Sequence, residues 1–144
     1  VRLARLRSRN GRFFPCWMVL NNMEHLTQEF PRMLDSQSMR RPQRVFDPDF
    51  SAQWEHLTVY FLWRYFLKAS VDGQVLSQTE SCLFHVLCIA ALFSCQDARN
   101  LQTLSTLASL YSKEVEHSDE NLRLLLRVFD RKTVSWQTLL SLLG

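Results

Sequence analysis

Glycine and proline are scarce in this chain, which has 3 and 4 of them among 144 residues. An all-β chain needs these residues at its many tight turns, and no segment alternates apolar and polar residues as a strand does. With so little glycine, no loop can cradle a phosphate group, and the G-x-x-x-x-G-K-[ST], G-x-S-x-G and H-E-x-x-H patterns are missing. The sequence therefore predicts no cofactor-binding site and no catalytic residues.

Cysteine is present but not arranged for disulfides or metal. Of Cys16, Cys82, Cys88 and Cys95, the last three fall within one expected helix, where they cannot connect distant parts of the chain. Cys82 and Cys88 lie about 120° apart around such a helix, so these thiols and His85 cannot converge on one ion. We predict buried thiols and no metal site.

Acidic residues are paired at two places only. Asp47 and Asp49 flank a proline and indicate a turn. The others, Glu114, Glu116, Asp119 and Glu120, follow a leucine-rich segment and are interpreted as a solvated patch.

Apolar residues recur at helical spacing through most of the chain. Six helices are expected, near residues 15–30, 51–70, 77–94, 101–111, 119–129 and 133–143. The sequence predicts an all-α fold with five to six helices in antiparallel pairs, as a compact bundle or a short degenerate helical-repeat segment.

Several residues indicate where helices begin and end. Pro15 suits the opening turn of the first helix, and Pro31 should end or kink it. Ser51 and Ser118 are expected N-caps, and Ser77 with Glu80 forms a capping box. Gly73 suits a left-handed turn between two helices.

The domain organisation follows from charge and from the helical pattern. Residues 1–44 hold nine arginines and three acidic residues, whereas residues 45–144 hold eight basic and eleven acidic residues. We divide the chain into a basic arm, residues 1–12, and one helical domain, residues 13–144, with a long connection at residues 35–50. Val45, Phe46 and Phe50 should hold this connection to the body. The first residue is Val1, which suggests a segment of a larger protein.

The arginine-rich arm has three possible roles: a solvated arm, a contact to acidic proteins or nucleic acid, or part of a transit peptide. Arginine binds phosphate well because its planar guanidinium forms two parallel hydrogen bonds. The candidate contacts are Arg2, Arg5, Arg7, Arg9, Arg12, Arg40, Arg41 and Arg44.

The aromatic segment at residues 54–68 is apolar around nearly its whole circumference. A helix of this kind is either enclosed by other helices or has a face for a partner, and the sequence leaves both open. Tryptophan and tyrosine are enriched at the centres of protein interfaces. The candidate interface residues are Trp54, Tyr60, Trp63, Arg64 and Phe66.

These observations favour a non-catalytic helical interaction or scaffold module, part of a larger intracellular complex. Its expected partner is another protein chain, as a homo- or hetero-oligomer, and no membrane partner is expected. The first alternative is a nucleic-acid-associated helical protein that uses the arm. The second is a small helical enzyme with a Cys/His site assembled by folding. A nuclear or cytoplasmic location is expected, or a mitochondrial one if the arm belongs to a transit peptide.

Overall fold

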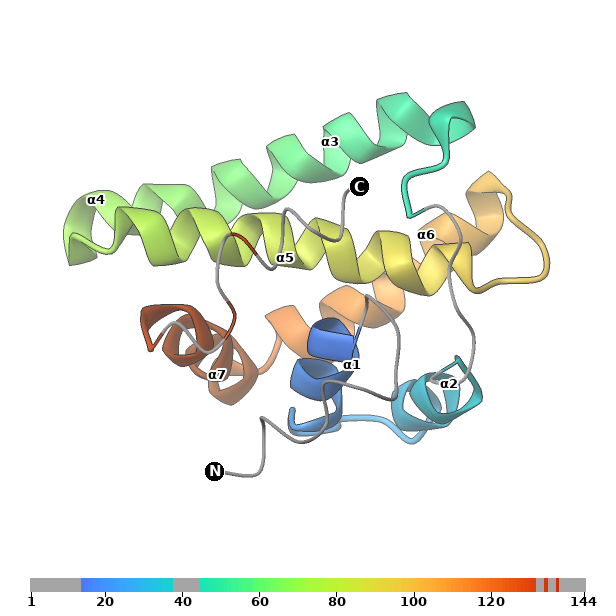
Figure 1. The fold of residues 1–144 in the computed structure, drawn as a ribbon, viewed down its shortest axis with the longest axis horizontal. Coiled ribbons are helices and arrows are strands. Elements are labelled where there is room, and N and C mark those ends of the chain that lie inside the picture. Colours follow the sequence, from blue (N-terminus) through green and yellow to red (C-terminus); the bar gives the residue numbers. More distant parts are fainter. Residues whose placement is uncertain (1–13, 38–44, 132–133, 135–136, 138–144) are drawn as a thin grey trace.

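The computed structural model describes residues 14–37, 45–131, 134 and 137, and within these residues it contains helices and no strand (Figure 1). The predicted all-α class is confirmed. The expected last helix at residues 133–143 and the basic arm fall outside this description. The elements are α1 (Phe14–Asn21), α2 (Glu29–Gln37), a 3₁₀ turn (Pro48–Phe50), α3 (Ser51–Phe61), the π turn η3 (Leu62–Phe66), α4 (Leu67–Asp72), α5 (Val75–Ser94), α6 (Leu101–Tyr111), the π turn η4 (Ser112–Glu116) and α7 (Asp119–Asp130).

Helix α5 is the centre of the fold. It crosses the molecule with α3 and α4 along one side and α1 and α7 on the other (Figure 1), and α6 also packs on it. Nearly every side chain from Gln78 to Phe93 is buried. By length and composition α5 could cross a membrane, and 72% of its most apolar window is buried among the other helices. The central helix is thus α5 and not the aromatic segment.

The aromatic segment forms one continuous helical rod along α5. Helix α3 passes through the π turn η3 into α4, and Gly73 then reverses the chain into α5 with φ 71°. A left-handed residue at this turn was predicted from the glycine. Trp54, Phe61 and Tyr65 face α5 and are buried, with exposures of 6%, 1% and 6%. One face of the rod is therefore part of the core.

The first predicted helix is interrupted. Its stripe runs through Val19, Met23 and Phe30, which are buried, yet α1 ends at Asn21 and α2 begins at Glu29. The side-chain amide of Asn21 donates a hydrogen bond to the backbone carbonyl of Trp17 at 2.8 Å, near the C-terminal end of α1. Pro31 lies in the first turn of α2, where its missing N–H is no loss. It therefore opens a helix that it was expected to end.

The predicted caps have mixed outcomes. The Ser118 hydroxyl accepts a hydrogen bond from the backbone N–H of Asn121 and caps α7 as predicted. Ser51 is instead the first residue of α3, which follows the Pro48–Phe50 turn without a side-chain cap. The capping box is also wrong, because α5 begins at Val75 and Ser77 is already inside its first turn. A serine followed three residues later by a glutamate can occur within a helix as well as at its start, so this spacing alone did not locate the start of α5.

The connection before α3 packs against the body through its aromatic residues. Phe46 meets Trp54 edge to face at 5.6 Å, and Phe50 meets Phe93 in the same way at 4.9 Å. Val45 is also buried. Such contacts fix the start of α3 on α5 and position the site described next.

Candidate functional site

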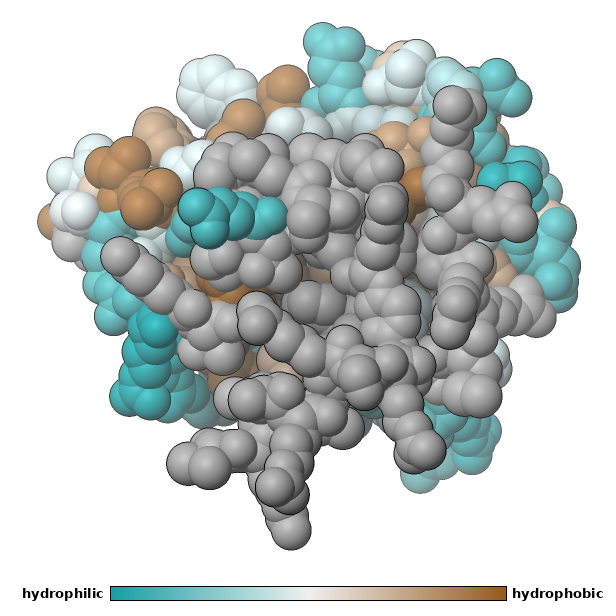
Figure 2. All heavy atoms as spheres, viewed as in Figure 1, coloured by the Kyte–Doolittle hydropathy of each residue, from teal (hydrophilic) through white to brown (hydrophobic). Residues whose placement is uncertain are grey.

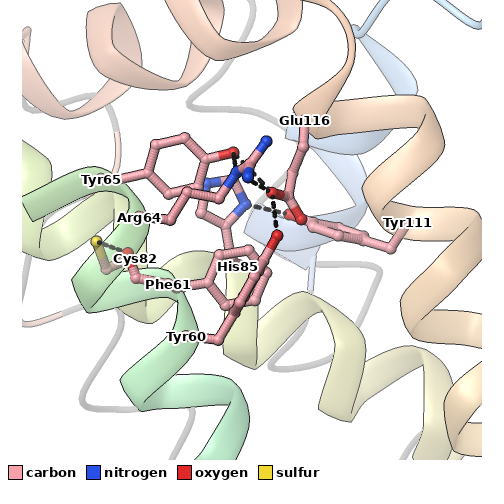
Figure 3. A network of polar contacts seen from close by, with 8 residues as sticks. All are labelled: Tyr60, Phe61, Arg64, Tyr65, Cys82, His85, Tyr111 and Glu116. Carbon is pink, nitrogen blue, oxygen red and sulfur yellow. Dashed lines mark hydrogen bonds and ion pairs between the residues drawn. The ribbon is translucent and has the colours of Figure 1, made fainter.

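Two π turns meet at one polar cluster. Turn η3 supplies Arg64 and Tyr65, and turn η4 supplies Glu116, from segments about fifty residues apart in the chain (Figure 3). The His117 amide donates to the Ser112 carbonyl at 3.3 Å, the spacing of a π turn. Single π turns within α-helices are rare and often lie at functional sites. Their convergence marks this cluster as the candidate site.

Glu116 is the centre of the cluster. Its Oε2 accepts hydrogen bonds from the hydroxyls of Tyr60 at 3.0 Å and Tyr65 at 2.8 Å, and it pairs with Nε of Arg64 at 2.8 Å. The Glu116 side chain is 1% exposed, whereas that of Arg64 is 45% exposed. A buried carboxylate requires such partners because an unpaired charge in the interior is costly. Glu116 is thus held as an anion by donors from one face of the rod.

The protonation of these partners follows from their surroundings. Burial, reinforced by the hydrogen bond to Glu116, raises the pKa of Tyr60. Burial likewise raises the pKa of Tyr65. The hydrogen bond to Tyr65 raises the pKa of Arg64. At neutral pH both tyrosine hydroxyls are protonated and donate hydrogen bonds to Glu116, while the Arg64 guanidinium is charged.

Rings surround the guanidinium. The Arg64 Cζ lies 5.9 Å from the ring centroid of Tyr60 and 5.7 Å from that of Tyr65. A cation over an aromatic face is attracted by the ring's quadrupole. The carboxylate and the two rings together form an environment for a cation, and Arg64 supplies that cation.

His85 lies deeper in the core than the Arg64–Glu116 pair and is fully buried. Its ring stacks on Phe61 at 4.6 Å and on Tyr65 at 5.4 Å, and its Nδ1 is 2.9 Å from the Tyr111 hydroxyl (Figure 3). Nε2 has no hydrogen-bond partner among the described residues. Burial lowers the pKa of His85 to about 3. The ring is therefore neutral at physiological pH.

The buried thiols near His85 are poor nucleophiles. Cys82 donates to the Phe61 carbonyl at 3.3 Å, and burial raises its pKa to about 11. Burial also raises the pKa of Cys88 and of Tyr111. Since the thiolate is the reactive form, this layer does not provide a Cys–His nucleophile. No group of three or more possible metal ligands occurs in the described ranges.

A groove leads to Glu116 from outside. It lies between α3 and α6, with Ile89 of α5 at its base. One cavity of about 590 Å³ ends at Tyr60, Glu116, Lys113 and His117. An overlapping cavity of about 340 Å³ extends past Leu57 and Ala108 toward the start of α6. Tyr60 and Glu116, which share a hydrogen bond, both line this groove.

A second buried carboxylate lies on η4. Glu114 is 1% exposed, and one of its oxygens accepts from the Leu26 amide at 2.8 Å. Asn121 bonds to both the N–H and the carbonyl of Glu24 and to the carbonyl of Glu114. These bonds hold the α1–α2 loop against the α6–α7 junction. The interpretation of Glu114 and Glu116 as solvated was wrong, because the π turn directs both into the interior.

Of the proposed interface residues, one is buried in the core and the others are exposed on the surface. Trp54 is buried against Phe93 and donates its indole N–H to the Asp47 carbonyl at 3.0 Å, so it is unavailable to a partner. Tyr60, Trp63 and Phe66 are exposed by 43%, 70% and 41%. More apolar surface follows around the α4–α5 turn, where brown atoms gather in Figure 2. It is formed by Leu67, Val71, Val75 and Leu76. An interface at these residues stays a prediction.

The arginines proposed to contact nucleic acid all lie outside the described residues. Asn121 and Tyr111 were not identified from the sequence, and Glu114 and Glu116 were assigned to a solvated patch. A π turn has no sequence signature, so nothing local could have identified Glu116. His85 had a signal, since it is the one histidine inside the apolar run at residues 83–93.

Comparison with known proteins gives one match. The family model described as FliB lysine N-methylase C-terminal domain matches residues 10–143, nearly the whole chain. No curated protein and no solved structure matches significantly. The expectation that the protein is not an enzyme is wrong, because the matched domain is that of a methylase. Neither a nuclear nor a mitochondrial location gains support from this match.

Proposed function

Because the chain belongs to the FliB lysine N-methylase C-terminal domain family, we propose that it docks the lysine-bearing polypeptide for a lysine N-methylase. The observation that supports this role is the groove between α3 and α6, which has an apolar base and, near one end, the carboxylate of Glu116 beside Lys113 and His117. The family match gives the chemistry of the occupant. In this proposal the methylase works inside the cell, and its partner is its protein substrate.

The groove has the features of a polypeptide site. Leu57, Ala108 and Ile89 offer apolar contacts along it, and serines of α6 form one rim. Ligand sites typically combine such apolar walls with a few polar groups that fix orientation. Glu116 near one end of the groove is a carboxylate with which a lysine can pair, and without a substrate it is paired with Arg64. The groove extends well beyond what one lysine side chain fills, which favours a polypeptide over the free amino acid.

A methylase also needs a methyl donor, and the described part of the chain does not fit one. Its single glycine there, Gly73, lies at the exposed α4–α5 turn. The described part of the chain also has no strand followed by a glycine-rich turn, the arrangement that usually holds a nucleotide-like cofactor. We assign no donor site to these residues and derive no transfer step from them.

The test is to fill the groove in the enzyme that contains this chain. Ser105 is exposed and lines both cavities, so Ser105→Trp should obstruct the groove without disturbing the core. We expect KM for the lysine-bearing protein to rise about tenfold, equivalent to about 1.4 kcal/mol of lost binding, with kcat little changed. Transfer of a labelled methyl group to lysine residues provides the rate.

Thr106→Trp is the matched control. Thr106 is the next residue of α6, is also exposed and is not among the residues that line the groove. This variant should keep the wild-type KM. Equal KM values for wild type and both variants would contradict docking in the groove.

The nucleic-acid role of the arm remains a separate proposal. It would require binding that weakens steeply between low and moderate salt, because arginine–phosphate contacts release counterions. Salt-insensitive binding, or none, would contradict it.

A further inference from the structure

Arg64 is the one cation paired with Glu116 in the described structure, and it is only partly enclosed. Its guanidinium contacts the carboxylate and lies near the rings of Tyr60 and Tyr65, while almost half of the side chain remains exposed. Glu116 is inside and fixed by two hydroxyls. The anion is therefore rigidly held, whereas the cation has a path to solvent.

A cation held in this way can be exchanged for another. Removing Arg64 alone would leave a buried carboxylate without a counter-charge, which is unfavourable. If a lysine ammonium enters as the guanidinium leaves, the charge stays balanced. An ammonium has three donors and is attracted by the same aromatic faces. The groove brings an external side chain close to this carboxylate, since Glu116 and Tyr60 both line it.

We propose that Glu116, Tyr60 and Tyr65 form a docking position for a lysine side chain of the substrate, and that Arg64 occupies it until the substrate arrives. This inference rests on the proposed function and adds the residues that select lysine. Methyl transfer requires the neutral amine. The proposed position binds the charged ammonium, so it serves recognition of the substrate, and no transfer step is assigned to it.

Lys113 also lines this end of the groove and is exposed. Its charge opposes an arriving ammonium through solvent, where the interaction is screened. Arg64 acts differently because it occupies the position itself. Variants of Arg64 and Lys113 therefore form a matched pair. One removes the cation that occupies the position, and the other removes a nearby positive charge that only repels the ammonium.

The experiment measures binding of two peptides to the 144-residue chain. One carries a single lysine among apolar residues, and the other is identical but acetylated at that lysine. Arg64→Met keeps the aliphatic stem and removes the charge. We expect it to lower Kd for the lysine peptide about fivefold and to leave Kd for the acetylated peptide unchanged. Lys113→Met should change Kd less than Arg64→Met. Glu116→Gln should bind both peptides with the same Kd.

A second measurement applies if Arg64→Met is poorly stable. In this variant n-butylammonium chloride should raise the melting temperature above that in sodium chloride of equal ionic strength, and in wild type it should not. An unchanged or higher Kd for the lysine peptide in Arg64→Met, an equal effect of Lys113→Met, or no stabilisation by butylammonium would overturn the proposal. If wild type binds neither peptide, groove docking fails, while the butylammonium measurement still tests the cation position.

Discussion

The buried histidine makes the stability of this protein depend on pH in a way that one substitution can isolate. His85 is fully buried and neutral, and its ring stacks on those of Phe61 and Tyr65. Replacing it by phenylalanine keeps a ring in this position and removes the titratable nitrogens. We expect His85→Phe to lose less stability on acidification than wild type.

The magnitude follows from the two pKa values. An unfolded histidine has a pKa near 6.5, and in the folded chain burial lowers the pKa of His85 to about 3. Above pH 6.5 both states are neutral, so the group imposes no penalty. As pH falls below 6.5, the unfolded chain takes up a proton that the folded chain excludes, and stability decreases. At pH 5 this loss is about 2 kcal/mol.

Urea unfolding followed by tryptophan fluorescence at pH 7 and pH 5 measures the effect. The decrease in unfolding free energy between these pH values should be about 2 kcal/mol smaller in His85→Phe than in wild type. His56→Gln removes an exposed imidazole and should retain the wild-type decrease. An identical decrease in wild type and His85→Phe would refute the argument, as would an NMR signal of folded His85 that titrates between pH 5 and 8.

Three further predictions concern the fold. Asn121→Ala should lower the unfolding free energy in urea by about 2–3 kcal/mol, because it leaves the buried carbonyl of Glu114 and the partly buried N–H and carbonyl of Glu24 without their partner; a loss below about 0.5 kcal/mol would contradict this. Gly73→Ala should cost about 1 kcal/mol in the same assay, since φ is 71° and an added Cβ meets no atom within 4 Å; unchanged stability would show that the turn adapts. The thiols of Cys82 and Cys88 should react with a disulfide reagent at pH 8 only under unfolding conditions, because burial raises the pKa of both; fast labelling of the native chain would argue against their burial.

Periodicity predicted the helices best where a helix has one apolar face and a clear cap. Helix α7 begins at the predicted Ser118, and α6 follows its leucine spacing. The same reasoning failed for the first helix, because the pattern continues across the break between α1 and α2. Buried residues on both sides of a turn can maintain helical spacing, so the spacing alone did not show that α1 ends at Asn21 and α2 begins at Glu29.

The candidate site was less accessible to sequence reasoning. Tyr60 and Arg64 were singled out for their residue types, and both belong to the cluster. Glu116 was assigned to solvent because it lies in an acidic run. Its burial depends on a π turn that rotates it inward and on a tyrosine pair from a distant helix. Trp54 was assigned to an interface, yet the folded connection covers it through Phe46.

The sequence by itself determined that this protein is helical, that an arginine-rich start precedes a mildly acidic body, and that Gly73 reverses the chain. These properties depend on local periodicity, composition and backbone freedom, which neighbouring residues set. Only the tertiary structure decided that α5 is the centre, that the two π turns meet, and that Glu116 is a buried anion paired with Arg64 at the end of a groove. Such features arise from contacts between residues far apart in the chain, and the burial and charge of a side chain depend on those contacts.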